Sequence, residues 1–222
     1  MPKEQPKDML NESTDEVIYR SKNKALFTNL VKTTRFNKRE CEAACLIHRK
    51  IQNVYKTLNL AAFRDILHSG FDFTENRRHV LLDRIFSLFD KHNNLQINSK
   101  EWVTGLAKLL DNAIETRIHF GYGVYDLMKS NQLTKDQMFP MLRGCFIKLQ
   151  PEEDADDMVK DMIDLLVKAI DINRDGDVSL EEMRDAVLKK NLLFVESMGP
   201  VFPSREAKHA FLSTITDRVP PF

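Results

Sequence analysis

Residues 171–182 read Asp-Ile-Asn-Arg-Asp-Gly-Asp-Val-Ser-Leu-Glu-Glu. Side chains that carry oxygen recur at alternate positions of this stretch and again at its twelfth position: Asp171, Asn173, Asp175, Asp177, Ser179 and Glu182. Gly176 stands at position 6, where a tight loop must turn sharply and glycine adopts the required positive φ without a Cβ clash. Because alternate residues of such a loop point inward, the stretch predicts a cage of oxygen atoms.

This spacing is that of the calcium loop of an EF-hand, a helix–loop–helix unit. Calcium is a hard cation that prefers six to eight oxygen ligands in a flexible shell. The expected ligands are the six residues above, with Asp177 contributing its backbone carbonyl, Ser179 acting through a water and Glu182 giving both carboxylate oxygens. One Ca²⁺ site is therefore predicted, with Mg²⁺ as the alternative occupant.

The apolar frame around this loop recurs along the chain. It consists of apolar residues four positions and one position before the loop, an acid at position 1, an apolar residue at position 8 and another after position 12. Copies surround loops 90–101 and 126–137, and a weaker copy surrounds residues 51–62. Position 8 of the four loops holds Leu58, Ile97, Leu133 and Val178. Since position 8 points away from the metal, Val178 is expected to pair with a partner loop in a short strand.

The repeats predict an all-α fold, because four helix–loop–helix units make two pairs and therefore two lobes. The predicted organisation is a charged N-terminal extension (1–32), an N-lobe (33–111), a C-lobe (112–190) and a C-terminal helical tail (191–222). Residues up to about Lys24 are polar and are expected to fray.

Apolar stripes predict the faces of three amphipathic helices. The stripes are Val80, Leu81, Ile85, Leu88 and Phe89; Trp102, Leu106, Leu109 and Leu110; and Met158, Met162, Leu165, Leu166 and Ala169. Pro151, followed by acids, predicts the start of the third helix. The tail has an apolar run (192–198) and a short helix around 207–212. It either lies in the hydrophobic groove of a lobe or completes the C-lobe core.

The other three loops are poorer in ligands. Position 3 of loop 90–101 is His92, a nitrogen ligand poorly matched to calcium, and position 6 is Leu95, which resists positive φ. Weak or no binding is expected there. Loop 126–137 has a methionine thioether at position 3 and a neutral glutamine at position 12, and loop 51–62 has no acids. These loops are expected to be structural partners of the loop at 171–182.

Composition excludes several classes of protein. The 222 residues carry zero net charge, with one basic stretch at 20–50, so we expect no nucleic-acid partner. That stretch is interpreted as solvated helix faces or as a surface for an acidic partner such as tubulin. Three cysteines give no disulfide framework and are expected to be buried, reduced thiols of an intracellular protein.

Targeting and catalytic signals are also lacking in the sequence. The Met-Pro-Lys start gives neither a signal peptide nor a myristoylation site, and no apolar run approaches the ~18 residues of a membrane span. We therefore expect a soluble, cytoplasmic protein without a membrane partner. A nucleophile–base pair, a glycine-rich phosphate loop and a zinc motif are all missing, and the six histidines are scattered, so we do not expect an enzyme.

Several stretches, most of them outside the calcium loop, resemble the calaxin family of EF-hand proteins. They are AFRDILH (62–68), FDK (89–91), EWVTGL (101–106), VYDL (124–127), MFPML (138–142), QPEED (150–154) and LLFVESMGP (192–200). Calaxins are proteins of motile cilia related to neuronal calcium sensors. The resemblance implies a role on axonemal doublet microtubules, with outer-arm dynein and its docking complex of coiled coils as partners, and adjustment of beating in response to calcium.

The chain departs from the family pattern at loop positions that matter for metal binding: His92, Leu95, Met128 and Gln137. The family's metal positions therefore carry over only to loop 171–182, which indicates a divergent member. Two functions stay open. The first is a calcium-binding adaptor of the cilium or flagellum axoneme, located in the cytoskeleton. The second is a calcium-sensing regulatory subunit of a soluble enzyme or channel, of the calcineurin-B or neuronal-sensor type.

Overall fold

The computed structural model describes residues 14–71, 79–126, 128–143, 152–190 and 200–216, and these are mostly helical. The elements are α1 (Thr14–Lys22), α2 (Lys24–Thr33), α3 (Lys38–Tyr55), α4 (Leu60–Phe71), α5 (His79–Phe89), α6 (Ser99–Leu109), α7 (Ile114–Tyr125), β1 (Gln132–Leu133), α8 (Lys135–Leu142), α9 (Glu152–Ile170), β2 (Val178–Ser179), α10 (Leu180–Asp185), the π-helical turn η2 (Ala186–Lys190) and α11 (Arg205–Ile215). The predicted all-α class is confirmed for these residues. None of these helices combines the length and apolar character needed to cross a membrane.

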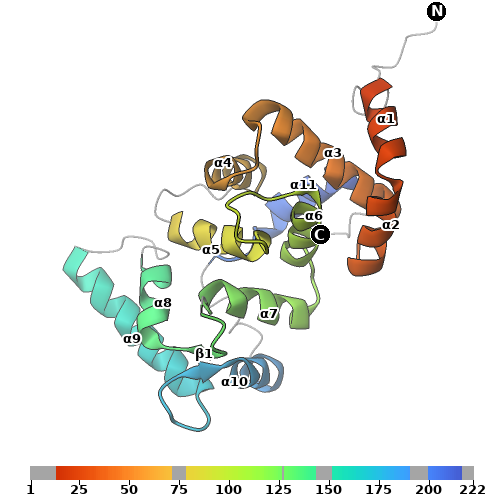
Figure 1. Ribbon diagram of the computed structural model, residues 1–222. Helices are drawn as coiled ribbons and strands as arrows, with labels where there is room; N and C mark the ends of the chain where they lie inside the picture. The colour runs from red at the N-terminus through yellow and green to blue at the C-terminus, as the bar shows by residue number, and fades with distance from the viewer. Residues whose placement is uncertain (1–13, 72–78, 127, 144–151, 191–199, 217–222) are drawn as a thin grey trace, which may run out of the picture.

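The helices form two groups that share one core (Figure 1). Helices α2 to α6 pack together with α11, while α7 to α10 form the second group around the two short strands. Helices α5 and α6 also pack against α7, which joins the groups. The centre of the first group is aromatic: Phe63 lies within 5.1 Å of Phe89 and 6.5 Å of Trp102, measured between ring centroids. Each buried ring of this size contributes roughly 1.5–3 kcal/mol through removal from water.

The loops pair through position 8. Strands β1 and β2 are antiparallel, with Leu133 opposite Val178, so the predicted pairing of Val178 with a partner loop is confirmed. In the first group the backbone N–H of Ile97 donates to the carbonyl of Leu58 at 2.9 Å. All four of these side chains are buried. The hydroxyl of Tyr122 donates to the Val178 carbonyl at 2.8 Å and ties helix α7 to β2.

The N-terminal segment differs from the expectation. Residues 14–22 and 24–33 are helical, as α1 and α2, where a polar extension was expected. Phe27 and Leu30 fall within the predicted extension, yet both are fully buried and α2 packs against α3 and α6. The guanidinium of Arg49 lies 4.8 Å from the ring centroid of Tyr19, which fixes α1 on α3. Polar residues surround these apolar positions, so the amphipathic helix was not recognised from the sequence.

The predicted helix faces are confirmed in two of three cases. Most of the α5 stripe and the whole α6 stripe are buried, although Val80 is 44% exposed. In α9 the prediction is wrong, because Met158 and Leu165 are largely exposed. The buried stripe of α9 is the next one around the helix: Val159, Ile163, Val167 and Ile170. Helix α9 starts at Glu152, as the acids after Pro151 predicted.

The described part of the tail contacts both groups of helices: the ring of Phe202 lies 5.8 Å from that of Phe120 on α7, and α11 lies on the first group. Helix α11 packs against α3 and α4, with the rings of Phe71 and Phe211 4.6 Å apart. Helix α11 itself lies on the first group of helices and is not part of the core of the second group. The apolar run 192–198 lies outside the described residues.

The thiols of α3 behave as predicted. Cys41 and Cys45 are free and fully buried, and burial raises the pKa of Cys45 to about 12. A thiol is unreactive when it stays protonated. Cys145 lies outside the described residues.

Candidate metal centre

Loop 171–182 joins the end of α9 to the start of α10. Ser179 caps α10: its Oγ accepts the Glu182 N–H at 3.2 Å, and Glu182 Oε2 accepts the Ser179 N–H at 2.9 Å. This reciprocal capping satisfies two backbone donors at the helix start. It also places the position-12 carboxylate beside the loop, where an EF-hand requires it.

The carboxylate at position 1 organises the first half of the loop. Asp171 Oδ1 accepts the N–H of Arg174 at 2.6 Å, and its Oδ2 accepts the N–H of Gly176 at 2.9 Å. Gly176 has a φ of 92°, in the region that glycine adopts without a Cβ clash. The chain therefore turns back at position 6, as the sequence predicted.

The side chains at positions 3 and 5 also face the loop backbone. Asn173 Oδ1 accepts the Asp175 N–H, and Asp175 Oδ1 accepts the Asp177 N–H, both at 2.9 Å. The Asn173 amide donates to Asp175 Oδ2 at 2.8 Å. Asn173 and Asp175 are exposed, so an ion can reach their oxygens from solvent.

Glu182 reaches across the loop to its first residues. Its Oε1 accepts the backbone N–H groups of Ile172 at 3.0 Å and Asn173 at 3.2 Å. Burial alone would raise the pKa of Glu182, but hydrogen bonds from Ser179, Ile172 and Asn173 outweigh burial and lower it. The group is therefore an anion at neutral pH and holds the two ends of the loop together.

The structure thus brings the six predicted residues into one short loop. Within the described ranges, no three His, Cys, Asp or Glu side chains meet as a metal-binding cluster, and the carboxylates of Asp171, Asp175 and Glu182 accept backbone N–H groups of the loop. The donor set is nevertheless all oxygen and mostly anionic, which fits Ca²⁺ or Mg²⁺.

The two degenerate loops have the same backbone turn as this one. Position 6 has positive φ in all three: 61° at Leu95, 55° at Asn131 and 92° at Gly176. Leu95 therefore adopts this conformation although leucine disfavours it. The Asp90 carboxylate accepts the Leu95 N–H at 2.7 Å, and this contact, with the pairing of the neighbouring Ile97, imposes the turn. Loop shape thus persists without glycine.

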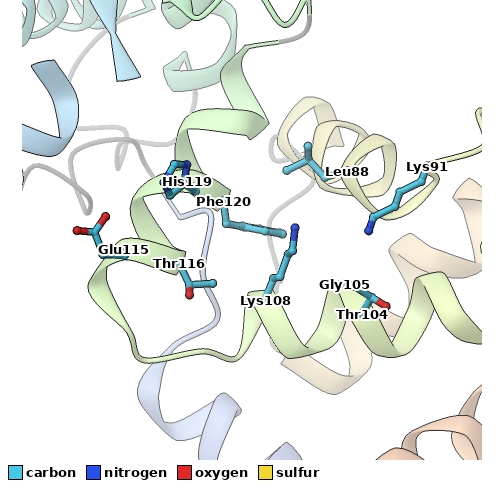
Figure 2. A pocket seen from close by; sticks show the side chains of 9 residues that line it. All are labelled: Leu88, Lys91, Thr104, Gly105, Lys108, Glu115, Thr116, His119 and Phe120. Atoms are coloured by element: carbon cyan, nitrogen blue, oxygen red, sulfur yellow. The ribbon is translucent and has the colours of Figure 1, made fainter. Parts of the chain in front are cut away.

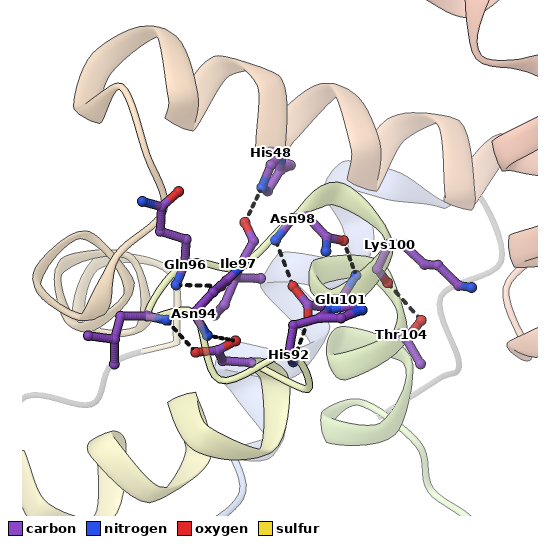
Figure 3. Close-up of polar contacts among 11 residues, drawn as sticks. His48, His92, Asn94, Gln96, Ile97, Asn98, Lys100, Glu101 and Thr104 are labelled. Atoms are coloured by element: carbon purple, nitrogen blue, oxygen red, sulfur yellow. Dashed lines mark hydrogen bonds and ion pairs between the residues drawn. The ribbon is translucent and has the colours of Figure 1, made fainter.

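Loop 90–101 is closed by its own imidazole (Figure 3). His92 Nδ1 lies 2.5 Å from Glu101 Oε1, and the Asn98 N–H donates to Glu101 Oε2 at 2.9 Å. The Glu101 side chain is only 2% exposed. Burial alone would raise its pKa, but hydrogen bonds from Asn98 and His92 outweigh burial and lower it. The side chain that replaces a ligand at position 3 therefore stabilises the anion at position 12.

This role of His92 was not predicted from the sequence, which suggested only a poor ligand. A usable signal existed, because positions 3 and 12 of an EF-hand loop always face each other. A cationic or donor side chain at position 3 can therefore reach the acid at position 12. In loop 126–137 the neutral Gln137 takes the capping role, accepting the Thr134 N–H at 3.0 Å, while Met128 is 80% exposed.

His48 links helix α3 to loop 90–101. It is fully buried, with Nε2 donating to the Ile97 carbonyl at 2.8 Å and Nδ1 accepting from the Ser99 hydroxyl at 3.0 Å. Figure 3 shows this contact above the loop. Burial lowers the pKa of His48, so the neutral imidazole is the stable form. It is a structural histidine whose two ring nitrogens both have hydrogen-bond partners.

Comparison with known proteins identifies relatives over most of the chain. No protein-family model matches it. Calaxin of Xenopus laevis is 32% identical over 182 residues, covering 79% of this chain and 86% of that protein. Calaxin of Bos taurus is 34% identical over 160 residues (72% and 74%), and calaxin of Danio rerio is 31% identical over 200 residues (85% and 93%). The chain belongs to the calaxin family.

Proposed function

We propose that this protein is a calcium-binding adaptor of the motile cilium or flagellum, attached to outer dynein arms or their docking complex on doublet microtubules. Loop 171–182 carries the proposal, because it keeps every ligand type of a calcium loop inside a member of the calaxin family. The resemblance of stretches outside the loops supports the axonemal part. This role places the protein in the cytoskeleton and requires no catalytic group.

The ion would be held by Asp171, Asn173, Asp175 and Glu182, with the Asp177 carbonyl and a water on Ser179. A bound divalent cation supplies the positive charge that the carboxylates share. Glu182 would then leave the backbone N–H groups of Ile172 and Asn173, and its movement would shift α10 relative to α9. A site with this donor set binds Ca²⁺ in a range of about 10⁻⁷–10⁻⁵ M.

Calcium responsiveness would be confined to the second group of helices. In our proposal the chain has four hands in two lobes, and only the hand at 171–182 binds metal. The turns of loops 90–101 and 126–137 are held by the carboxylates of Asp90 and Asp126, which accept the N–H groups at position 6. We expect the conformation of the first group to be independent of calcium, so that this group serves for docking. The conformation of the second group would change when calcium binds.

The test uses the purified full chain as bait in salt extracts of ciliary axonemes, with calcium or with a chelator. Outer-arm dynein or docking-complex subunits should be recovered, and their yield should depend on calcium for the native chain. Glu182→Gln should recover the same subunits with no dependence on calcium, since it removes the bidentate anion. Recovery of a soluble phosphatase, kinase or channel in place of axonemal subunits would contradict the proposal and favour the regulatory-subunit alternative.

A further inference from the structure

A cavity of about 320 Å³ opens between α5, α6 and α7 (Figure 2). Its apolar wall is formed by Phe120, which is 5% exposed, and the half-buried Leu88. The volume lies at the lower end of the range for ligand sites, about 300–1,000 Å³. It can therefore take one or two side chains of a partner rather than a large cofactor.

Two lysines stand at the open side of this cavity. Lys91 follows α5 and Lys108 lies on α6, and Figure 2 shows both amines directed into the space between these helices. Neither lysine has an acidic partner among the described residues. Burial, and then the charge of Lys91, lower the pKa of Lys108. Two like charges held near each other without a counter-ion favour an incoming anion.

Glu115 is the one carboxylate among the residues that line the cavity, and it does not serve as a counter-ion for the two lysines. Glu115 is held by Arg184, whose Nε and Nη2 donate to it at 3.0 and 2.8 Å. Its charge is therefore already balanced from α10, and the cavity keeps a positive rim over an apolar wall. Thr104 and Thr116 add hydroxyl groups between the two regions.

We infer that this cavity is a docking site for an acidic, leucine-bearing helix of a partner protein. A carboxylate of that helix would lie between the amines of Lys91 and Lys108, and a neighbouring apolar side chain would contact Phe120 and Leu88. Lysine suits this task because its ammonium is a compact point charge that accepts a carboxylate from many directions. The inference stands on the cavity and its charges, independently of calcium binding at loop 171–182 and of the axonemal role.

The test measures fluorescence anisotropy of a fluorescein-labelled helical peptide of Leu-Glu-Glu-Leu-Leu-Glu repeats with the full chain at moderate salt. Lys91→Gln with Lys108→Gln should weaken binding by about tenfold or more, because both close charge pairs are lost. Lys100→Gln is the matched control, since Lys100 is exposed on the same helix away from the cavity. It should change the affinity less than about twofold, as a charge outside the interface does.

Peptide variants separate the two halves of the site. Replacing leucine by serine should weaken binding by removing the contact with Phe120, and replacing glutamate by lysine should abolish it. The inference is overturned if the native chain does not bind the peptide, or if Lys100→Gln weakens binding as much as the double variant. It is also overturned if inorganic phosphate or a single-stranded oligonucleotide competes as well as unlabelled peptide, because the site would then be a general anion site.

Discussion

Leu95 adopts a left-handed backbone conformation, with a φ of 61° and a side chain that is 73% exposed. This conformation costs a non-glycine residue roughly 1–2 kcal/mol in the folded state. Glycine adopts it at a lower cost but loses more conformational entropy on folding. Leu95→Gly is therefore expected to increase the free energy of unfolding by about 0.5–1 kcal/mol. Urea unfolding followed by the fluorescence of Trp102, the single tryptophan, measures the change.

Asn131→Gly is the matched control for Leu95→Gly. Asn131 occupies the same loop position with a φ of 55°, but asparagine tolerates this region much better than leucine. Its replacement should stabilise the protein less. An equal or larger gain for Asn131→Gly would show that Leu95 is not strained.

His48 gives a pH dependence of stability. Its pKa is lowered by burial in the folded protein, against the hydrogen bond to Ile97, and returns to about 6.5 on unfolding. The contribution of neutral His48 is therefore complete above about pH 6.5 and is lost as the pH falls towards the folded-state pKa, by at most about 1.4 kcal/mol per pH unit. The free energy of unfolding should decrease as the pH falls below about 6.5.

The control distinguishes His48 from the other titrating groups. His48→Gln should flatten the profile in this window, because glutamine can donate to the Ile97 carbonyl and does not titrate. If His48→Gln keeps the full slope, the acid sensitivity arises elsewhere.

At the scale of elements, the close packing of the Phe89 ring on helix α6 depends on Gly105. A Cβ at Gly105 would overlap the ring of Phe89, which packs against the α6 backbone. Gly105→Ala should therefore destabilise the protein by about 1–3 kcal/mol through overpacking, although alanine favours helices. Thermal unfolding monitored by circular dichroism provides the measurement.

Gly70→Ala is the matched control for Gly105→Ala and should change the stability in the opposite direction. Gly70 lies in helix α4, and a Cβ there would meet nothing within 4 Å. Gly70→Ala should stabilise the protein by up to about 1 kcal/mol, because only helix propensity changes. A loss of stability in Gly70→Ala, or none in Gly105→Ala, would contradict the packing described for α6.

Helix faces show which elements were predictable from the sequence. The stripe of α6 was predictable because Trp102, Leu106 and Leu109 are its bulky apolar residues and all face the core. In α9 apolar residues cover more than half of the helix, so periodicity alone did not select the buried stripe. Packing against the neighbouring helix α8 selects the buried stripe of α9: Val159 and Ile163 are buried, while Met158 is exposed. Helix α2 was missed because its apolar positions lie among lysines and threonines.

At the scale of the whole molecule, the loops and their pairing were more predictable from the sequence than the side-chain contacts and helix positions around them. Ligand chemistry and spacing identified loop 171–182, and position 8 identified its pairing through Leu133. The hydrogen bond between His92 and Glu101 and the left-handed conformation of Leu95 both depend on the loop backbone that the repeats share. Preferences of single residues do not reveal such a backbone. The position of α11 on α3 and α4 depends on long-range packing that leaves no local pattern.

Isothermal titration of the full chain with Ca²⁺ tests the metal centre most directly, with Glu182→Gln and Glu181→Gln compared side by side. The native chain should bind one ion per molecule. Glu182→Gln should lose at least about tenfold in affinity, because the bidentate anion is gone. Glu181→Gln makes the same charge change at an exposed neighbour and should bind like the native chain. Two or more sites, or unchanged affinity in Glu182→Gln, would contradict a single centre at loop 171–182.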